Sequence, residues 1–391
     1  MKLFYIANVR LPTEKAHGIQ IVRMCESFGK LGIDVSLIAP MRFKTKKLRF
    51  FNEDIYSFYK INKNFQLKKL FNMDFLLLDN YLPKILTGLP FLIQNSSFLV
   101  TCLIYSLCKK VDLIYTRSFL FTVLLNFFKK NSVILELHNL PFKKFSQIIF
   151  KKFIKRINKI VVINENIKNI LISWGVDGNK ILTGTSAIAD SCLKVIKKDD
   201  ARIKLNIAKN EKIIMYTGNL YAWKGVYTLA DAALLAPEYV FYIVGGSDFD
   251  KEVQMFKIYL KNKKIKNINM VGYVKPSLIQ YYLAAADILV APNSAKSDAS
   301  MNYTSPLKLY EYMASRRPII LSDLTSMRNL IDAKFVFWMK PDDPKSLIDK
   351  IKEVENNESI AKKKAQEAFS FVKTKTWDNR AEDILKYWNL I

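Results

Sequence analysis

The side chains best suited to chemistry gather in residues 302–314. Ser305 and Pro306 predict the start of a helix, because a serine hydroxyl can accept from free backbone N–H groups and the fixed φ of proline suits the first helical position. The first turn of a helix attracts anions, and Lys308 would lie in that turn. Glu311 follows three residues later, so both side chains leave the same face. One turn of helix would thus present a cation for an anionic group and a carboxylate for paired hydroxyls.

Two short apolar runs flank this helix. Residues 286–292 predict a buried strand before the loop, and residues 317–323 predict another strand after the helix. Lys308 and Glu311 would therefore stand at the top of a β-loop-α-β unit, where open α/β sheets bind ligands. A solvated helix face with the same spacing is the alternative interpretation.

Residues 306–314, with the sequence PLKLYEYMA, resemble the signature region of retaining glycosyltransferases of family four. The resemblance implies the GT-B fold, in which two Rossmann-like domains face each other across a cleft. It also implies that Glu311 holds the ribose hydroxyls of a nucleoside diphosphate sugar. The family motif has a further glutamate at the position of Tyr303, so the identity of the transferred sugar stays open. The donor-binding residues implied are Gly18, Gly218, Asn219, Lys224, Val274, Tyr303, Thr304, Ser305, Pro306, Leu307, Lys308 and Glu311.

A second lysine lies after the strand predicted for residues 212–218. Lys224 stands at the entry to the next helix, where a point charge could meet a phosphate, although an isolated lysine is usually solvated. The spacing resembles the GRLxxxKG motif of the family, whose two cations neutralise the donor diphosphate without a metal. Asn219 replaces the arginine of that motif, so Lys224 and Lys308 would carry more of the task, or Arg10 would compensate.

The first half of the chain offers a glycine and a histidine. Gly18 lies between a strand predicted for residues 2–9 and a helix predicted for residues 19–30, where a glycine lets backbone approach a ligand. His138 ends a strand predicted for residues 132–138, with Glu136 on the same face. Both Gly18 and His138 could instead be structural. The resemblance implies that Gly18 lies under the donor diphosphate and that His138 contacts the transferred sugar, and a structural role is expected for Glu136.

No metal or other cofactor is expected. Asp248 and Asp250 form an Asp-x-Asp triplet of the type that binds divalent metals in the other large glycosyltransferase fold, but it falls where family four has a glycine-rich loop. Val274 ends a strand predicted for residues 269–274, and the resemblance implies that backbone there binds the donor base. Backbone contacts do not separate uracil from guanine.

The chain is long and unevenly charged. Its 391 residues suffice for two domains, and the net charge is +26. Residues 1–195 hold 30 Lys+Arg and 12 Asp+Glu, whereas residues 196–391 hold 31 and 23. A basic first domain favours an anionic membrane surface or a phosphate-bearing acceptor, and a general bias toward lysine is the alternative. No helix-turn-helix, zinc-finger or RNA-recognition signature supports nucleic acid as a partner.

Residues 85–108 carry no charge and could cross a bilayer by length. Pro90 and the polar residues 94–97 would be costly at the membrane centre, so a loop and a buried helix are predicted, with a position in the membrane interface as the alternative. The four scattered cysteines and a start that leads directly into a strand predict a cytoplasmic protein, with a peripheral position on the inner face of the cell membrane left open.

The predicted fold is α/β with two facing Rossmann-like domains. Residues 1–195 would bind the acceptor, residues 196–375 the nucleotide-sugar donor, and residues 376–391 would form a helix that packs back on the first domain. The predicted function is that of a metal-independent retaining hexosyltransferase in surface polysaccharide or lipid-linked glycan synthesis, with His138, Lys224 and Glu311 as catalytic residues. Its partners would be a nucleotide-sugar donor and a glycan or lipid-linked acceptor. A sugar-nucleotide epimerase of the same fold and a non-catalytic basic adaptor at a membrane remain alternatives.

Overall fold

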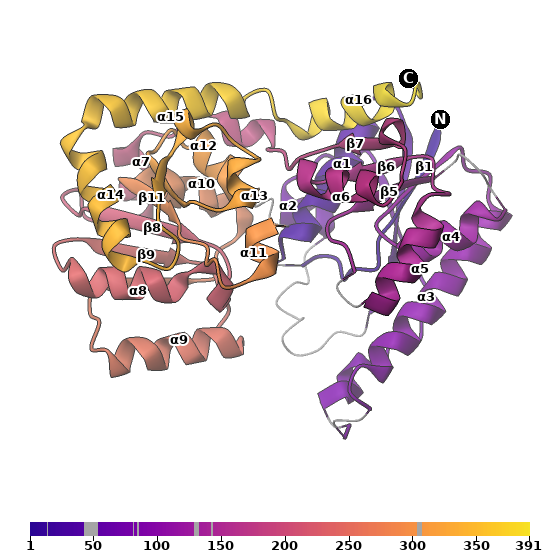
Figure 1. The fold of residues 1–391 in the computed structure, drawn as a ribbon, viewed down its shortest axis with the longest axis horizontal. Coiled ribbons are helices and arrows are strands. Elements are labelled where there is room, and N and C mark those ends of the chain that lie inside the picture. The colour runs from indigo at the N-terminus through magenta and orange to yellow at the C-terminus, as the bar shows by residue number, and fades with distance from the viewer. Residues whose placement is uncertain are drawn as a thin grey trace. The chain divides into compact units, whose positions relative to one another are not determined.

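The chain forms two α/β units (Figure 1). The computed structural model describes residues 1–13, 15–42, 54–80, 82–83, 86–128, 133–141, 144–302 and 307–391. Unit 1 comprises Met1–Gly184 together with Trp377–Ile391, and unit 2 comprises Thr185–Thr376.

Unit 1 is built on a parallel sheet of seven strands in the order β3-β2-β1-β4-β5-β6-β7. The strands are β1 (Lys2–Ile6), β2 (Asp34–Pro40), β3 (Gln66–Leu70), β4 (Leu113–Thr116), β5 (Val133–Leu137), β6 (Ile160–Val162) and β7 (Ile181–Thr183). The central strands β4, β5 and β6 are buried along their whole length, which explains their nearly continuous apolar sequences. The chain order reverses between β1 and β4, which makes this pair of strands the switch point of the sheet.

The helices of unit 1 include the last helix of the chain. They are α1 (Ala16–Lys30), α2 (Ile55–Tyr59), α3 (Leu89–Cys108), α4 (Phe119–Asn126), α5 (Lys144–Ile154), α6 (Glu165–Ser173) and α16 (Trp377–Tyr387). Helix α16 packs on α1, where the carboxylate of Asp378 accepts from Ser27 and from the ammonium of Lys30 at 2.8 Å. The C-terminal residues thus complete the unit that the N-terminal residues begin.

Unit 2 is built on a parallel sheet of six strands in the order β10-β9-β8-β11-β12-β13. The strands are β8 (Ile213–Thr217), β9 (Val240–Val244), β10 (Ile268–Gly272), β11 (Ile288–Ala291), β12 (Ile319–Ser322) and β13 (Phe337–Met339). The helices are α7 (Lys198–Leu205), α8 (Val226–Leu235), α9 (Lys251–Asn262), α10 (Pro276–Ala285), α11 (Asp298–Asn302), α12 (Leu307–Ala314), α13 (Thr325–Arg328), α14 (Pro344–Asn356) and α15 (Glu358–Val372). The switch point of this sheet lies between β8 and β11.

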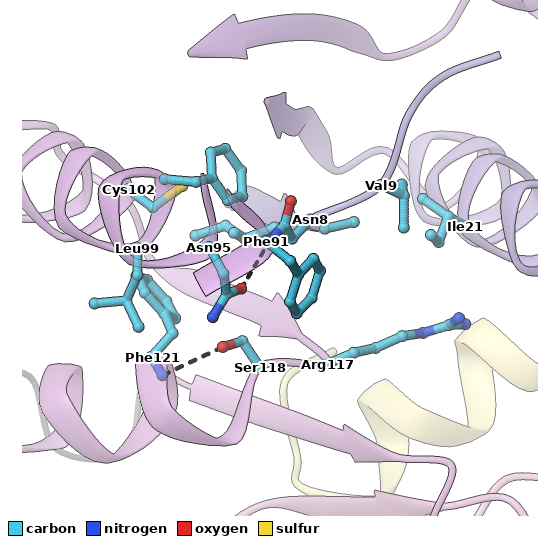
Figure 2. A pocket seen from close by; sticks show the side chains of 13 residues that line it. Asn8, Val9, Ile21, Phe91, Asn95, Leu99, Cys102, Arg117, Ser118 and Phe121 are labelled. Atoms are coloured by element: carbon cyan, nitrogen blue, oxygen red, sulfur yellow. Dashed lines mark hydrogen bonds between the residues drawn. The ribbon is translucent and has the colours of Figure 1, made fainter. Parts of the chain in front are cut away.

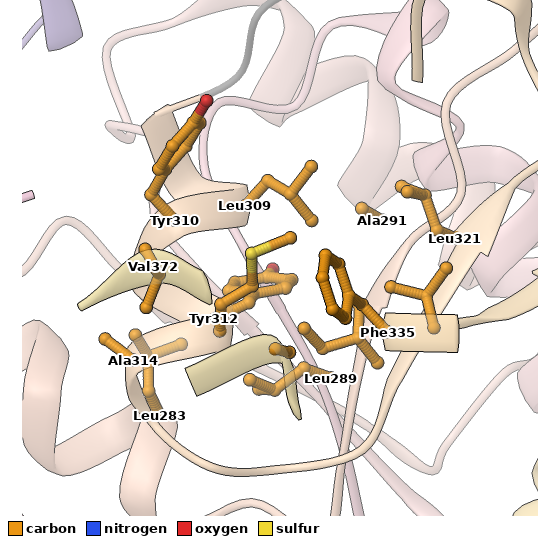
Figure 3. Close-up of a cluster of buried hydrophobic side chains, with 14 of the residues drawn as sticks. Leu283, Leu289, Ala291, Leu309, Tyr310, Tyr312, Ala314, Leu321, Phe335 and Val372 are labelled. Atoms are coloured by element: carbon orange, nitrogen blue, oxygen red, sulfur yellow. The ribbon is translucent and has the colours of Figure 1, made fainter. Parts of the chain in front are cut away.

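An apolar core anchors helix α12 to the unit 2 sheet. Leu309 and Tyr312 of α12 are fully buried in one cluster with Leu289 of β11 and Leu321 of β12 (Figure 3). Every residue of α12 except Glu311 is buried, so the helix is enclosed on most sides and Glu311 is its least buried position.

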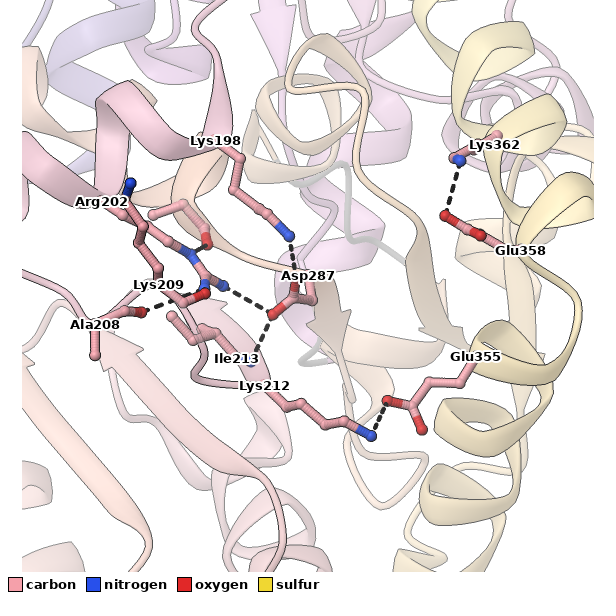
Figure 4. Close-up of polar contacts among 11 residues, drawn as sticks. Lys198, Arg202, Ala208, Lys209, Lys212, Ile213, Asp287, Glu355, Glu358 and Lys362 are labelled. Atoms are coloured by element: carbon pink, nitrogen blue, oxygen red, sulfur yellow. Dashed lines mark hydrogen bonds and ion pairs between the residues drawn. The ribbon is translucent and has the colours of Figure 1, made fainter.

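A polar cluster fixes the opposite, amino-terminal ends of β8 and β11 (Figure 4). Arg202 of α7 is 1% exposed and donates to the Asp287 carboxylate at 2.9 Å. The same carboxylate accepts from the backbone N–H of Ile213 at 2.8 Å and from Lys198 at 2.9 Å. A buried guanidinium requires such partners, so Asp287 ties α7 to two neighbouring strands.

The structure differs from the sequence-based expectations in three places. The first boundary between units lies after Gly184 and not after residue 195, because Ile188 belongs to the unit 2 core. The first helix begins at Ala16, so Gly18 lies in its first turn and not in a loop. The helix predicted to be buried in residues 85–108 is continuous from Leu89 to Cys108, yet only 28% of its apolar window is buried.

Candidate functional site

Near the switch point of the unit 2 sheet, glycine residues without side chains stand at the carboxyl ends of the strands. The N–H of Gly218, after β8, donates to the carbonyl of Val244 at 2.8 Å, and that of Gly245, after β9, donates to the carbonyl of Gly272 at 2.8 Å. Gly245 has φ 129°, and a Cβ there would lie 2.4 Å from the Gly218 carbonyl oxygen. Only glycine fits this conformation, so a ligand could approach the main chain closely here.

Lys224 lies at the same edge, in the turn that leads from β8 into α8. The following residue, Gly225, has φ 75°, and a Cβ on it would lie 1.7 Å from the carbonyl oxygen of Pro292. The loop after β8 can therefore touch the loop after β11 only with glycine at this position. Burial lowers the pKa of Lys224 to about 8. Its Nζ lies 5.0 Å from the centroid of the Trp223 ring.

Helix α12 supplies a second lysine. Lys308 is 8% exposed, and its Nζ has no hydrogen-bond partner among the described residues. The Nζ lies 4.1 Å from the centroid of the Tyr216 ring. Burial and then repulsion from Lys224 hold the pKa of Lys308 well below its usual range. A buried ammonium that has no hydrogen-bond partner among the described residues and lies near a second lysine is costly, and a bound anion would relieve that cost.

Glu311 lies one turn after Lys308 on α12. Burial raises the pKa of its carboxyl to about 7. The next residue, Tyr312, accepts from the N–H of Thr217 at 2.8 Å through its hydroxyl, which reaches the carbonyl of Val290 at 3.4 Å. These bonds hold α12 against the ends of β8 and β11 and so set where Lys308 and Glu311 point.

The structure places Gly218, Asn219, Lys224, Leu307, Lys308 and Glu311 on the loops and helix that follow β8 and β11. Asn219 accepts from the hydroxyl of Tyr216 at 2.7 Å through its carbonyl. Val274 follows β10 at the same edge of the sheet. Tyr303, Thr304, Ser305 and Pro306 lie outside the described residues.

His138 and Gly18 belong to unit 1. His138 follows β5, and its Nε2 lies 2.8 Å from Oε1 of Glu136. Burial lowers the pKa of His138, reinforced by Arg117, so the imidazole is neutral at pH 7. Glu136 is ionised and can only accept, because Arg117 and Arg380 hold its pKa well below the usual range. The imidazole proton therefore sits on Nε2, which leaves a lone pair on Nδ1.

Gly18 has a packing explanation in unit 1. A Cβ there would lie 2.5 Å from the hydroxyl of Tyr59 and 2.4 Å from the methyl of Thr13. That hydroxyl accepts from the N–H of Thr13 and donates to its carbonyl, both at 2.8 Å. The structure therefore explains Gly18 without a ligand, and its place under a diphosphate stays a prediction.

A cavity of 260 Å³ lies at the switch point of the unit 1 sheet (Figure 2). Asn8 follows β1 and Arg117 follows β4, and Phe91, Asn95 and Leu99 of α3 line the other side. The amide of Asn8 donates to Asn95 at 2.8 Å. The lining is mostly apolar, and Nε of Arg117 has no hydrogen-bond partner in the part of the chain that the structure describes.

Sequence reasoning missed Asn8, Arg117 and Arg380. Asn8 and Arg117 follow β1 and β4, near the carboxyl ends of the strands predicted there, and that position is the signal that could have found them. Arg380 donates to Glu136 at 3.0 Å and to the carbonyl of Gly184 at 3.2 Å. It is separated from Glu136 by 244 residues, so no local pattern connects the two.

Both aspartates of the Asp-x-Asp triplet interact with nearby residues of the chain. Asp248 pairs with Lys257 at 2.7 Å, and Asp250 accepts from the N–H of Ser247 at 3.1 Å. No group of three or more metal-ligating side chains occurs among the described residues.

Comparisons with known proteins agree with this arrangement. Residues 197–370 match the family described as glycosyl transferases group 1. A curated relative, the processive diacylglycerol alpha-glucosyltransferase of Acholeplasma laidlawii, is 26% identical over 126 residues, which are 32% of this chain and 36% of that protein. The match thus spans about a third of the length of that relative.

Solved structures match over the whole chain at low identity. Anabaena HepE in complex with UDP and glucose has a TM-score of 0.76 and 14% identity, with all of both chains covered. Sucrose-phosphate synthase from Thermosynechococcus elongatus has a TM-score of 0.78 and 17% identity, with 100% of this chain and 98% of that chain covered.

The fold class and the resemblance predicted from the sequence are confirmed: the fold is GT-B, and residues 197–370 match the glycosyl transferases group 1 family.

Proposed function

We propose that this chain transfers a hexose from a UDP-hexose to an acceptor hydroxyl with retention at the anomeric carbon. The observation that carries the proposal is the buried ammonium of Lys308, which lies near Lys224 and has no hydrogen-bond partner among the described residues. A diphosphate supplies the anionic charge that these two groups lack. UDP as the carrier is supported by the complexes of Anabaena HepE with UDP and with UDP-glucose.

In the proposed reaction, the bond between the anomeric carbon and the diphosphate oxygen breaks. The acceptor oxygen bonds to the same face of that carbon, and the acceptor proton passes to the leaving diphosphate. Lys224 and Lys308 stabilise the charge that develops on the diphosphate, so the proposal assigns no step to a metal. Glu311 accepts from the ribose hydroxyls, and Nδ1 of His138 accepts from a hydroxyl of the transferred sugar.

We place the acceptor in unit 1. The cavity at its switch point combines apolar walls, such as Phe91 and Leu99, with the guanidinium of Arg117. This chemistry suits an amphiphile that carries both a hydrocarbon part and a polar or anionic head, so a lipid-linked acceptor is favoured over a free polysaccharide end. The curated relative acts on diacylglycerol by its name, which agrees with this choice.

Calorimetry with UDP, GDP and CMP in the presence of EDTA tests the donor site. We expect UDP to bind without metal and the Glu311→Ala variant to bind it at least about tenfold more weakly, since charge-assisted hydrogen bonds contribute roughly 1.5–3 kcal/mol each. Binding that requires metal, or that ignores Glu311, would contradict the assignment. No binding of any nucleotide would favour a non-catalytic adaptor, and turnover of UDP-glucose without an acceptor would favour an epimerase.

A further inference from the structure

Helix α3 buries a mixed stripe of Gln94, Phe98, Cys102 and Ser106 and exposes large apolar side chains on its other face. Gln94 and Ser106 are fully buried, and Gln94 donates to the Asn8 side chain at 3.1 Å. On the outward face Leu92 is 60% exposed and Ile104 is 57% exposed. Gln94 and Asn95 of the polar run that argued against a membrane span both bond to Asn8, so this run fastens α3 to the end of β1. No element among the described residues covers the exposed apolar face.

Exposed apolar side chains continue on helices α4 and α5, which lie near α3 in Figure 1. Phe119 of α4 stacks on Phe150 of α5, with ring centroids 4.1 Å apart. Phe127, directly after α4, is 65% exposed, and Phe145 of α5 is 74% exposed. Of the 32 large apolar side chains that are exposed among the described residues, 18 lie between residues 71 and 149. Apolar exposure is therefore concentrated on one part of unit 1, which is uncommon for a surface that faces only water.

The charge of these helices has one sign. None of α3, α4 and α5 contains an aspartate or glutamate. Exposed cationic side chains lie among the apolar residues or directly after them. They are Lys109 after α3, Lys144 and Lys152 in α5, and Lys155 and Arg156 just beyond α5. Charge complementarity therefore requires an anionic partner.

A groove of 530 Å³ between α4 and the end of α5 combines both properties. Phe127 and Phe153 form apolar walls, and Arg156 lies over the Phe153 ring at 5.6 Å from its centroid. An acyl chain fits such walls, and a phosphate head group fits the guanidinium.

We propose that the outward surface of α3, α4 and α5, called here the α3–α5 surface, binds an anionic lipid bilayer and holds unit 1 on the membrane without crossing it. A bilayer offers an apolar interior and a negatively charged rim together, which matches the two properties of the surface. This inference does not depend on the transfer reaction, since it uses no donor-site residue.

Co-sedimentation of the full chain with lipid vesicles tests the inference. One set of vesicles contains phosphatidylcholine only, and the other contains equal parts of phosphatidylcholine and phosphatidylglycerol. We expect binding to the anionic vesicles and about tenfold weaker binding of Ile104→Glu, which places a charge on the apolar face. Ile258→Glu on α9 is a matched control, because Ile258 is 59% exposed in unit 2 and Ile104 is 57% exposed.

A second pair of variants tests the cations. Lys152→Glu with Lys155→Glu should weaken binding to anionic vesicles by about fivefold or more per lysine, whereas the same change at the exposed Lys261 and Lys263 of unit 2 should have little effect. UDP binding should stay unchanged in all these variants, which shows that they are folded and separates this test from that of the donor site.

Four outcomes would overturn the inference. They are no binding of the wild type to either vesicle, equal binding to neutral and anionic vesicles, equal losses in Ile104→Glu and Ile258→Glu, and a dimer in size-exclusion chromatography that Ile104→Glu dissociates without any vesicle binding. The last result would assign the α3–α5 surface to contact between two copies of the chain.

Discussion

At the scale of single residues, Lys308 shows how the protein gives up stability for binding. Its ammonium is buried beside Lys224 and has no hydrogen-bond partner among the described residues. The aromatic face of Tyr216 compensates only in part, since a cation–π contact contributes roughly 0.5–2 kcal/mol. A group held in this way is a candidate for a functional site, because a purely structural lysine would gain nothing from such a position.

We therefore expect Lys308→Met to stabilise the free protein while it weakens UDP binding. Removing the uncompensated cation should raise the free energy of unfolding by about 1–2 kcal/mol, and loss of the contact to the diphosphate should weaken UDP binding at least about tenfold. Denaturant titration and calorimetry measure the two effects. Lys261→Met, at an exposed site on α9, is the control and should change neither. A destabilised Lys308→Met that binds UDP normally would contradict the role given to this lysine.

The pKa values of Glu311 and Lys224 predict how UDP binding depends on pH. Below pH 7 the Glu311 carboxyl, with a pKa of about 7, takes up a proton and can no longer accept from both ribose hydroxyls. Above pH 8 the Lys224 ammonium, with a pKa of about 8, loses the charge that holds the diphosphate. Affinity should therefore be highest between these values and fall on both sides, by up to about tenfold per pH unit.

Calorimetry between pH 5.5 and 9.5 measures this profile. UDP itself titrates near pH 6, as phosphate groups with a second pKa of about 6 do. The Glu311→Gln variant separates the titration of Glu311 from that of UDP. In this variant the fall in UDP affinity at acid pH should become smaller by the part that Glu311 causes. An acid limb that is identical in this variant would show that the ligand alone is responsible.

At the scale of elements, helix α16 reaches the candidate catalytic histidine through one side chain. Arg380 is 7% exposed and donates to Glu136, which in turn bonds to His138. Burial lowers the pKa of His138, and positive charge from Arg117 and Arg380 lowers it further. The last helix of the chain thus helps to keep this imidazole neutral and to fix its tautomer.

Replacing Arg380 with methionine should affect both stability and the histidine. The Glu136 carboxylate would lose a buried partner, at a cost of about 3–5 kcal/mol, and the pKa of His138 would rise toward its usual value. The titration of the imidazole C–H signals by NMR is simple to assign, because the chain has only two histidines. Lys30→Met removes the exposed ion pair between α1 and α16 and is the control, expected to cost at most about 1 kcal/mol without a shift of His138. An unchanged pKa of His138 in Arg380→Met would disprove the connection.

At the scale of the whole molecule, the two units carry different parts of the proposed reaction. Lys224, Lys308 and Glu311 belong to unit 2, while His138 and the apolar cavity belong to unit 1. Each unit has its own sheet and its own switch point, so a change in one need not disturb the fold of the other.

His138→Ala should separate binding from transfer. We expect kcat/KM for transfer from UDP-glucose to fall at least about a hundredfold, within the range for removal of one polar group from a reacting centre. The dissociation constant of UDP should stay within about twofold of the wild type, since the donor residues lie in unit 2. Release of UDP, followed with an acceptor panel that includes diacylglycerol vesicles, measures the first quantity. A variant that transfers at the normal rate would remove His138 from the site.

Much of unit 2 and of its candidate site follows from local sequence. The helix of residues 307–314, the strands on either side of it and the positions of Lys224, Lys308 and Glu311 were predictable, because residue type, spacing and apolar periodicity act over one or two elements. The GT-B fold followed from the motifs and is confirmed. The roles of these residues in catalysis stay predictions.

Only the tertiary structure decided what the side chains meet. It showed that Lys308 has no hydrogen-bond partner in the part of the chain that the structure describes, while Glu136 has three cationic or imidazole neighbours. It also showed that Arg380 comes from the far end of the chain. It also reversed the predicted burial of α3, because an apolar sequence fits a core and a lipid surface equally well. Local sequence pattern determines which helices and strands form. The charge around each side chain and its degree of burial depend on contacts between residues hundreds of positions apart.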